Sequence, residues 1–236
     1  MTWQLLPVAC VQLIEAKVPN IIGRSRKLIN VSTGFRLIDC LFPIATGQRE
    51  LIIGDRQTGK TSLALAVIFC QVSRNLEVVK RKIIFGIYVC TSQKCSNIMR
   101  IYEMLQRNNI NAFSCILFAG VTESMTLQFI SPLSGTSIAE YFRNQGNHSL
   151  IVYDDLSKHA VSYRQLSLYL RKPAGREAFP SDIFYLHARL LERSCCLNYC
   201  RSGGTLTCLP IIETLCNDLS AFVATNVISE QMDSCI

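Results

Sequence analysis

Residues 50–65 have the sequence ELIIGDRQTGKTSLAL, and they decide the fold that we expect for this chain. The apolar run LII is short enough for a buried strand, and the apolar SLAL at the end predicts the start of a helix. Between them, Gly54, Gly59, Lys60 and Thr61 match the pattern G-x-x-x-x-G-K-[ST]. The stretch therefore predicts a strand, a phosphate-binding loop and a helix in direct succession. The alternative is an incidental glycine-rich turn.

The spacing of this motif is the one that phosphate binding requires. Glycines let backbone N–H groups curl around anionic oxygens, and the following helix directs its positive end toward them. The Lys60 side chain can reach the β- and γ-phosphates of a nucleotide, and the Thr61 hydroxyl can bind Mg²⁺. The candidate nucleotide-binding residues of the loop are Gly54, Asp55, Arg56, Gln57, Thr58, Gly59, Lys60 and Thr61.

Length and composition indicate one α/β domain with short extensions. The chain has 236 residues, of which 49% are apolar and 17% charged, so it can bury a sizeable core and shows no sign of disorder. The net charge of +7 is moderate and its basic residues are scattered. We interpret them as solvated surface, with nucleic acid or an acidic partner as the alternative. No apolar run reaches the length of a membrane span, and the first residues do not resemble a cleaved targeting peptide.

The cysteine content favours a reducing compartment. Twelve cysteines occur, but several stand inside apolar runs such as AVIFC and IIFGIYVC, where most are expected to be small buried hydrophobic residues. Paired C-x-x-C spacing with nearby histidines is missing from the cluster of Cys195, Cys196 and Cys200. A structural zinc site is therefore not expected.

Strand-like and helix-like segments alternate along the chain after a lead-in of residues 1–48, which contains a possible short helix at residues 35–41. By the crossover rules, this alternation predicts a mainly parallel sheet flanked by helices on both faces. Strands are expected at residues 51–53, 83–89, 112–119, 149–153, 205–213 and 221–228, and helices at residues 61–72, within 91–109, at 134–145, 156–170 and 183–193.

The apolar run at residues 149–153 ends in Asp154 and Asp155. An acidic residue at the end of a buried strand can hold the Mg²⁺ shell in phosphate-loop proteins, and an Asp can also cap the next helix. We expect Asp154 to serve the metal and Asp155 to be the cap. Metal ligation is thus predicted for Thr61 and Asp154. The alternative is that both acids are only turn and cap residues.

The set of residues that hydrolysis requires is incomplete in this sequence. Hydrolysis needs a carboxylate that orients or deprotonates the attacking water, commonly at the end of the neighbouring strand. Gln93 stands at that place, and the nearest acid, Glu103, lies almost three helical turns farther on. An amide can hydrogen-bond water but cannot take its proton. The sequence therefore predicts a nucleotide-binding site without catalytic residues.

Three segments carry a family resemblance: GQRELIIGDRQTGKT, the run from AEYFRNQGNHSL through FYLHARLLER, and TLTCLPIIETLCNDLSAFVATNVIS. They resemble the nucleotide-binding domain of the α subunits of F-type, proton-translocating ATP synthases, in which GDRQTGKT distinguishes α subunits from catalytic β subunits. The similarity extends over about residues 18–229. It implies a RecA-like domain at residues 49–229, preceded by a remnant of an inter-domain connection within residues 1–48 and followed by a divergent tail at residues 230–236.

The resemblance also implies what such a domain binds. Lys60, Thr61 and Asp154 fall on the family's positions for the phosphates and magnesium of a non-catalytic Mg-ATP site, and Gln93 falls where β subunits carry the catalytic glutamate. Partners would be β subunits, alternating with α in a hexameric ring that forms the catalytic core. The loop of residues 173–182, which begins at Pro173 and ends at Asp182, would face the γ subunit of the central stalk.

Function and location follow from the same resemblance. The chain would contribute to ATP synthesis coupled to proton transport, with peripheral membrane association through the complex and without nucleic acid. The expected location is the matrix side of the mitochondrial inner membrane, with plastid thylakoid or bacterial plasma membrane as alternatives.

Departures from the family leave other functions open. The β-barrel domain, the helical domain and the arginine that enters the neighbouring β site have no counterpart in these residues, and Ser181 stands where the family has glycine. The alternatives are a stand-alone ATP-binding regulatory protein, a non-functional truncated copy and a RecA-like nucleic-acid translocase. The last would need a basic, aromatic pore loop, which the sequence does not show.

Overall fold

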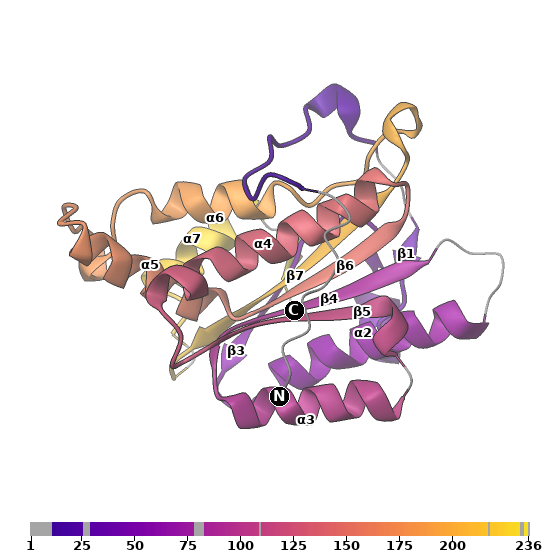
Figure 1. The fold of residues 1–236 in the computed structure, drawn as a ribbon, viewed down its shortest axis with the longest axis horizontal. Coiled ribbons are helices and arrows are strands. Elements are labelled where there is room, and N and C mark those ends of the chain that lie inside the picture. The colour runs from indigo at the N-terminus through magenta and orange to yellow at the C-terminus, as the bar shows by residue number, and fades with distance from the viewer. Residues whose placement is uncertain are drawn as a thin grey trace.

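A six-stranded, wholly parallel sheet forms the middle layer of the molecule (Figure 1). The computed structural model describes residues 11–25, 29–77, 83–108, 110–216, 218–231 and 234–235. Every residue of the central strand His148–Asp154 is buried, as expected where helices cover both faces of a sheet. The strands, in their order across the sheet, are β5 (Ser114–Gly120), β4 (Ile84–Gln93), β6 (His148–Asp154), β7 (Thr205–Thr214), β3 (Glu50–Asp55) and β8 (Ser234–Cys235).

Helices cover the two faces of this sheet, and each face has its own apolar core. In Figure 1, α2 (Lys60–Glu77) and α3 (Cys95–Arg107) lie below the sheet. The other face is covered by α4 (Met125–Asn144), α5 (Leu156–Tyr169), α6 (Ile183–Leu191) and α7 (Phe222–Gln231). The predicted α/β class, with a parallel sheet flanked by helices in a P-loop NTPase fold, is therefore confirmed. Among the described helices, none is both long enough and apolar enough to cross a bilayer.

The lead-in contains short elements, and the expected helix near residue 35 is confirmed as α1 (Arg36–Leu41). A two-stranded antiparallel sheet joins β1 (Asn30–Val31) to β2 (Ile44–Ala45). Single 3₁₀ turns are η1 (Ile21–Gly23), η2 (Asn111–Phe113), η3 (Arg176–Ala178) and η4 (Tyr199–Arg201).

One expected strand is wrong: residues 221–228 do not extend the sheet, because α7 begins at Phe222. Their β-branched residues favour a strand by propensity, which tertiary packing can override. Here Ala224 and Val227, three positions apart, are both buried against the second core, and that spacing is helical. Along the chain, α4 also starts earlier than expected, at Met125, because the Ser124 hydroxyl caps it by accepting from Leu127 N–H at 3.3 Å.

The segment of residues 11–25 lies across α4 and α6 and is held there by backbone contacts. Ser137 Oγ lies 3.1 Å from the carbonyl oxygen of Leu13 and 3.0 Å from that of Ile14. Arg193 Nη1 donates to the same Ile14 carbonyl at 2.8 Å. The side chain of Leu13 itself is 76% exposed.

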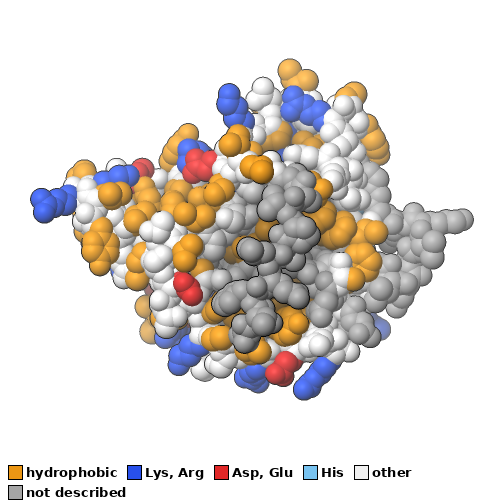
Figure 2. Space-filling model, viewed as in Figure 1, with side chains coloured by type: hydrophobic (Ala, Val, Ile, Leu, Met, Phe, Trp, Pro, Cys, Tyr) orange, Lys and Arg blue, Asp and Glu red, His pale blue; other side chains and the backbone are white. Residues whose placement is uncertain are grey.

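Basic side chains do not form one patch on the face that Figure 2 shows. Lys and Arg appear there at separate places, with hydrophobic and uncharged surface between them. This distribution agrees with our interpretation of the basic residues as solvated surface.

Candidate functional site

The phosphate-binding loop connects β3 to α2 as the sequence predicts. Gly59 has a φ of 93°, a conformation that glycine adopts without strain, and a Cβ built on it would meet nothing within 4 Å. Gln57 also has a positive φ, of 62°. The hydroxyl of Thr58 donates to the carbonyl of Asp55 at 2.8 Å, which closes the loop on its own backbone. The loop therefore curves around open space at the start of α2.

The Lys60 side chain folds back along the loop. Its ammonium donates to the carbonyl of Gly54 at 2.7 Å and also to the carbonyl of Asp55. Both acceptors are neutral, so the positive charge of Lys60 stays close to the first turn of α2. The first N–H groups of a helix have no acceptor within the helix. The ammonium and these N–H groups together form a donor set suited to phosphate oxygens.

Asp154 lies against the same turn of α2, although 93 residues separate it from Thr61. Thr61 Oγ1 donates to Asp154 Oδ2 at 2.9 Å, and the Tyr88 hydroxyl donates to the same oxygen. Burial first, and then the charge of Asp154, raise the pKa of Tyr88 well above its usual value. Tyr88 therefore stays protonated and acts as a donor.

Asp155 has the separate role that the sequence suggested for it. It is the N-cap of α5, and its Oδ1 accepts from Lys158 N–H at 2.7 Å. Burial raises its pKa from the ordinary value, with the positive charge of Lys158 acting in the opposite direction. The prediction that Asp155 caps the next helix is thus confirmed.

Two contacts that the sequence analysis missed brace the loop against β7. Arg56 Nε donates to Glu213 Oε1 at 2.5 Å, and Thr214 Oγ1 donates to Asp55 Oδ1 at 2.6 Å. Strand register explains both, because Asp55 lies beside Thr214 in the parallel pair of β3 and β7. The strand order that makes them neighbours depends on the whole sheet, so the local sequence carried no signal for it.

A cleft of about 1110 Å³ opens beside the loop. Gln93 lies in it at the end of β4, where the register with β5 is irregular and Ser92 has a φ of 54°. Glu103 is the only acidic residue among the described residues that line it. The lining residues include Arg56, Gln57, Thr61, Ser62, Gln93, Lys94, Asn97, Arg100, Glu103, Arg107 and Lys158.

The residues present fit a Mg-nucleotide. Magnesium takes few protein ligands and keeps substrate phosphates and waters, so one hydroxyl and one carboxylate suffice for the protein's share. Thr61 and Asp154 provide this pair. Within the described part of the chain, groups of three or more His, Cys, Asp and Glu side chains suited to a metal ion are not found.

Buried histidines pack between α5 and α6 and take no part in this site. The rings of His159 and His187 lie 5.5 Å apart, and His159 Nε2 lies 3.1 Å from the carbonyl oxygen of Phe129. Burial lowers the pKa of His159 to about 4 and that of His187 to about 3, so both are neutral near pH 7. Both histidines are thus packed residues of the interior.

The expectation that most cysteines are buried holds only in part. Among the described cysteines, Cys90, Cys195, Cys196 and Cys208 are buried, whereas Cys40, Cys95, Cys200 and Cys216 are exposed. The exposed ones are not members of the hydrophobic core clusters of the described residues. Burial raises the pKa of Cys208 to about 12, so its thiol is inert.

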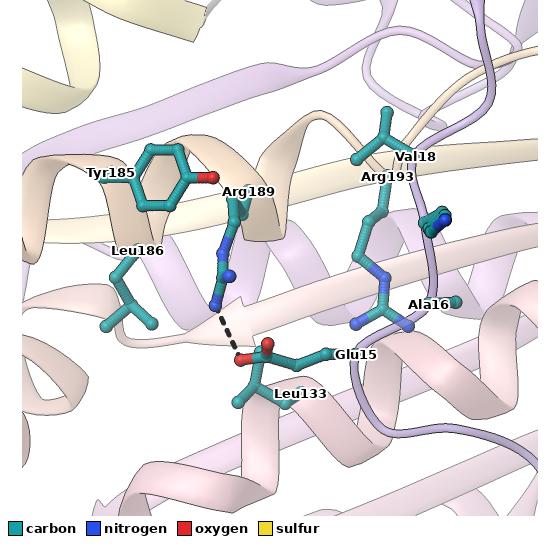
Figure 3. A pocket seen from close by; sticks show the side chains of 9 residues that line it. Glu15, Ala16, Val18, Leu133, Tyr185, Leu186, Arg189 and Arg193 are labelled. Carbon is teal, nitrogen blue, oxygen red and sulfur yellow. Dashed lines mark hydrogen bonds and ion pairs between the residues drawn. The ribbon is translucent and has the colours of Figure 1, made fainter.

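A second cavity, of about 320 Å³, lies between the lead-in segment, α4 and α6, away from the loop (Figure 3). Its polar rim is an ion pair, with Arg189 Nη2 2.7 Å from Glu15 Oε1. None of the predicted site residues lines it.

The sequence model of the ATP synthase alpha/beta family, nucleotide-binding domain, matches residues 34–234. The chain belongs to the ATP synthase alpha/beta family. Its resemblance to α subunits is confirmed by three relatives, each aligned over 92% of this chain: mitochondrial ATP synthase subunit alpha of Trypanosoma brucei brucei (49% identical), and ATP synthase subunit alpha of Neorickettsia sennetsu (51%) and of Rickettsia canadensis (50%). The chain spans 37%, 42% and 42% of their lengths, respectively.

Proposed function

We propose that this chain holds Mg-ATP without hydrolysing it, as an α-type subunit or a fragment of one in a proton-translocating ATP synthase. One observation carries the proposal. Thr61 and Asp154 are joined at 2.9 Å at the helix start that follows the phosphate-binding loop, whereas an amide, Gln93, lines the cleft beside that loop.

Each loop residue has a separate role in the proposed site. The backbone N–H groups at Gly59, Lys60 and Thr61 receive phosphate oxygens, and the Lys60 ammonium leaves its two carbonyl acceptors to pair with the phosphates. Thr61 and Asp154 would hold magnesium, which would neutralise phosphate charge when bound. The remaining loop residues, Gly54 to Thr58, shape the backbone, with Arg56 fixed by Glu213.

Hydrolysis is unfavourable in this site for a chemical reason. The Gln93 amide can orient water but cannot accept a proton from it. Glu213, a carboxylate beside the loop, is held in an ion pair with Arg56 at 2.5 Å. The cleft therefore favours retention of ATP over its consumption.

The partners follow from family membership. The α-type relatives support assembly with β subunits, in the alternating hexamer that makes the catalytic core. We assign the loop of residues 173–182 to the γ subunit, and exposure of residues 173–178 supports this assignment. The proposed location is the matrix side of the mitochondrial inner membrane, or the corresponding face of a plastid thylakoid or bacterial plasma membrane. The mitochondrial and bacterial relatives favour the first and the last of these.

Equilibrium binding of ATP to the purified chain, with Mg²⁺ and with EDTA, tests the site. We expect Mg²⁺ to strengthen binding and the bound nucleotide to be recovered as ATP after prolonged incubation. Recovery as ADP would contradict the non-catalytic assignment. Co-expression with β subunits tests assembly: β subunits that purify without this chain would contradict the α-type role and favour a stand-alone ATP-binding protein.

A further inference from the structure

Tyr88 is buried in β4, with its hydroxyl placed on the carboxylate that the proposed function assigns to magnesium. The residue is 1% exposed and packs in the core that α2 and α3 share with the sheet. In the register of β4 with β6, Tyr88 lies opposite Val152, two positions before Asp154. Side chains two positions apart in a strand share a face, so the long tyrosine ring extends along the sheet to Asp154.

The contact of this hydroxyl is specific. A tyrosine hydroxyl that is buried requires a hydrogen-bond partner, and within the described residues Asp154 Oδ2 is the one found for Tyr88. Thr61 Oγ1 donates to the same oxygen at 2.9 Å. Two donors, one from β4 and one from α2, thus converge on one oxygen and fix the carboxylate between strand and loop. Hydrogen bonds to an ionised acceptor are the stronger kind.

We propose that Tyr88 is a positioning residue for magnesium, which keeps the Asp154 carboxylate beside Thr61. This inference rests on the proposed Mg-ATP site. Without the Tyr88 hydroxyl, the carboxylate would lose one of its two anchors and would be free to rotate about its side-chain bonds. Nucleotide binding through Lys60 and the loop N–H groups would remain, whereas the additional affinity that Mg²⁺ provides would fall.

The test compares ATP affinity in Mg²⁺ with ATP affinity in EDTA, for the full chain and for Tyr88→Phe. Loss of a hydrogen bond to a charged group corresponds to roughly a tenfold or greater change in an equilibrium constant. We expect the ratio of the two affinities to fall by about tenfold, with affinity in EDTA little changed. An unchanged ratio would overturn the inference.

Tyr153→Phe is the matched control. Tyr153 is also 1% exposed and directly precedes Asp154, but its hydroxyl pairs with Thr136 Oγ1 at 2.7 Å, in the core on the other face of the sheet. It loses the same group from a similar environment, so its ratio should equal that of the parent chain. An equal fall in both variants would show a general packing effect and would also overturn the inference.

Two further variants keep the test decisive. In Asp154→Asn, the added Tyr88→Phe change should lower the magnesium ratio no further, because the two residues act through one contact. If the Phe variant does not fold, Tyr88→Met, whose flexible side chain fills irregular space, also lacks the hydroxyl and gives the same comparison. A parent chain in which Mg²⁺ does not strengthen ATP binding would refute the proposed function itself, whereas an unchanged ratio in Tyr88→Phe would refute this inference alone.

Discussion

Arg193 and Glu140 form a bidentate ion pair inside the protein, between the segment after α6 and the middle of α4. Arg193 Nη2 lies 2.6 Å from Glu140 Oε2, and Arg193 Nε donates to Oε1 at 3.1 Å. Both side chains are 3% exposed. Arg143 shares the same carboxylate, at 3.4 Å from Oε1. One buried acid therefore compensates two buried guanidinium groups.

Replacing Glu140 by Gln should destabilise the fold strongly. The change leaves Arg143 and Arg193 buried without a carboxylate, and breaking a buried pair costs about 3–5 kcal/mol. Urea unfolding followed by circular dichroism measures this loss. Glu103→Gln is the control, since Glu103 is 58% exposed and lies 3.9 Å from Arg107. The Glu103→Gln variant should lose less than about 1 kcal/mol of unfolding free energy. Equal losses in both variants would contradict the large contribution that we assign to the buried ion pair.

Replacing Lys60 by Ala should weaken ATP binding roughly 10- to 100-fold, the value of a charge-assisted contact with phosphate. Stability should change little, because the contacts removed are hydrogen bonds to two carbonyls of the loop itself. Isothermal titration calorimetry measures the affinity. Lys94→Ala, which removes a lysine that lines the cleft, should retain nearly full affinity. A larger loss in Lys94→Ala than in Lys60→Ala would refute the placement of the phosphates.

His159 and His187, two of the buried histidines, predict that stability falls in mild acid. Above about pH 6.5 they are neutral in both the folded and the unfolded chain, so they contribute no pH dependence. Below that pH, both histidines bind protons in the unfolded chain. In the folded chain they stay neutral down to about pH 4 for His159 and about pH 3 for His187. Each histidine then lowers the free energy of unfolding by about 1.4 kcal/mol per pH unit.

Urea unfolding at pH 7, 6 and 5 should show this slope. In the double variant His159→Gln with His187→Gln, the slope that remains comes from the other titratable groups and should be clearly smaller. Identical slopes in the two proteins would contradict the assignment of the acid sensitivity to this pair.

Gly135 should not tolerate a methyl group, although alanine is the better helix former. A Cβ at this position of α4 would lie 2.4 Å from Val89 Cγ2 in β4, so the helix would have to move away from the sheet. Overpacking of this kind costs about 1–3 kcal/mol. Thermal or urea unfolding of Gly135→Ala measures it. At Gly175 the nearest contact of a built Cβ is 3.4 Å, so Gly175→Ala should be nearly neutral.

The fold was predictable where a local sequence pattern was sufficient to define a helix, strand or loop. The loop motif at residues 54–61 and the apolar runs of β6 and β7 required only spacing and burial. Residues 221–228 failed this test, because their β-branched composition favoured a strand and only the packing of Ala224 and Val227 against the second core makes them α7. Propensity is a weak guide wherever the tertiary environment decides.

The candidate site was predictable in its residue types and not in its supports. Lys60, Thr61 and Asp154 could be assigned from motif and spacing. Tyr88 could not, because its relation to Asp154 depends on β4 lying beside β6, and 66 residues separate the two side chains. For the same reason, Glu213 looked like an ordinary strand residue until the order of the sheet placed it beside Arg56.

The attachment of residues 11–25 has a consequence for sequence variation. Ser137 and Arg193 hold this segment by the carbonyl oxygens of Leu13 and Ile14, which every amino acid supplies. The amino acids at positions 13 and 14 can thus differ among related chains without loss of these backbone contacts. The side chains that make these contacts belong to α4 and to the segment after α6, more than a hundred residues away in the sequence from Leu13 and Ile14.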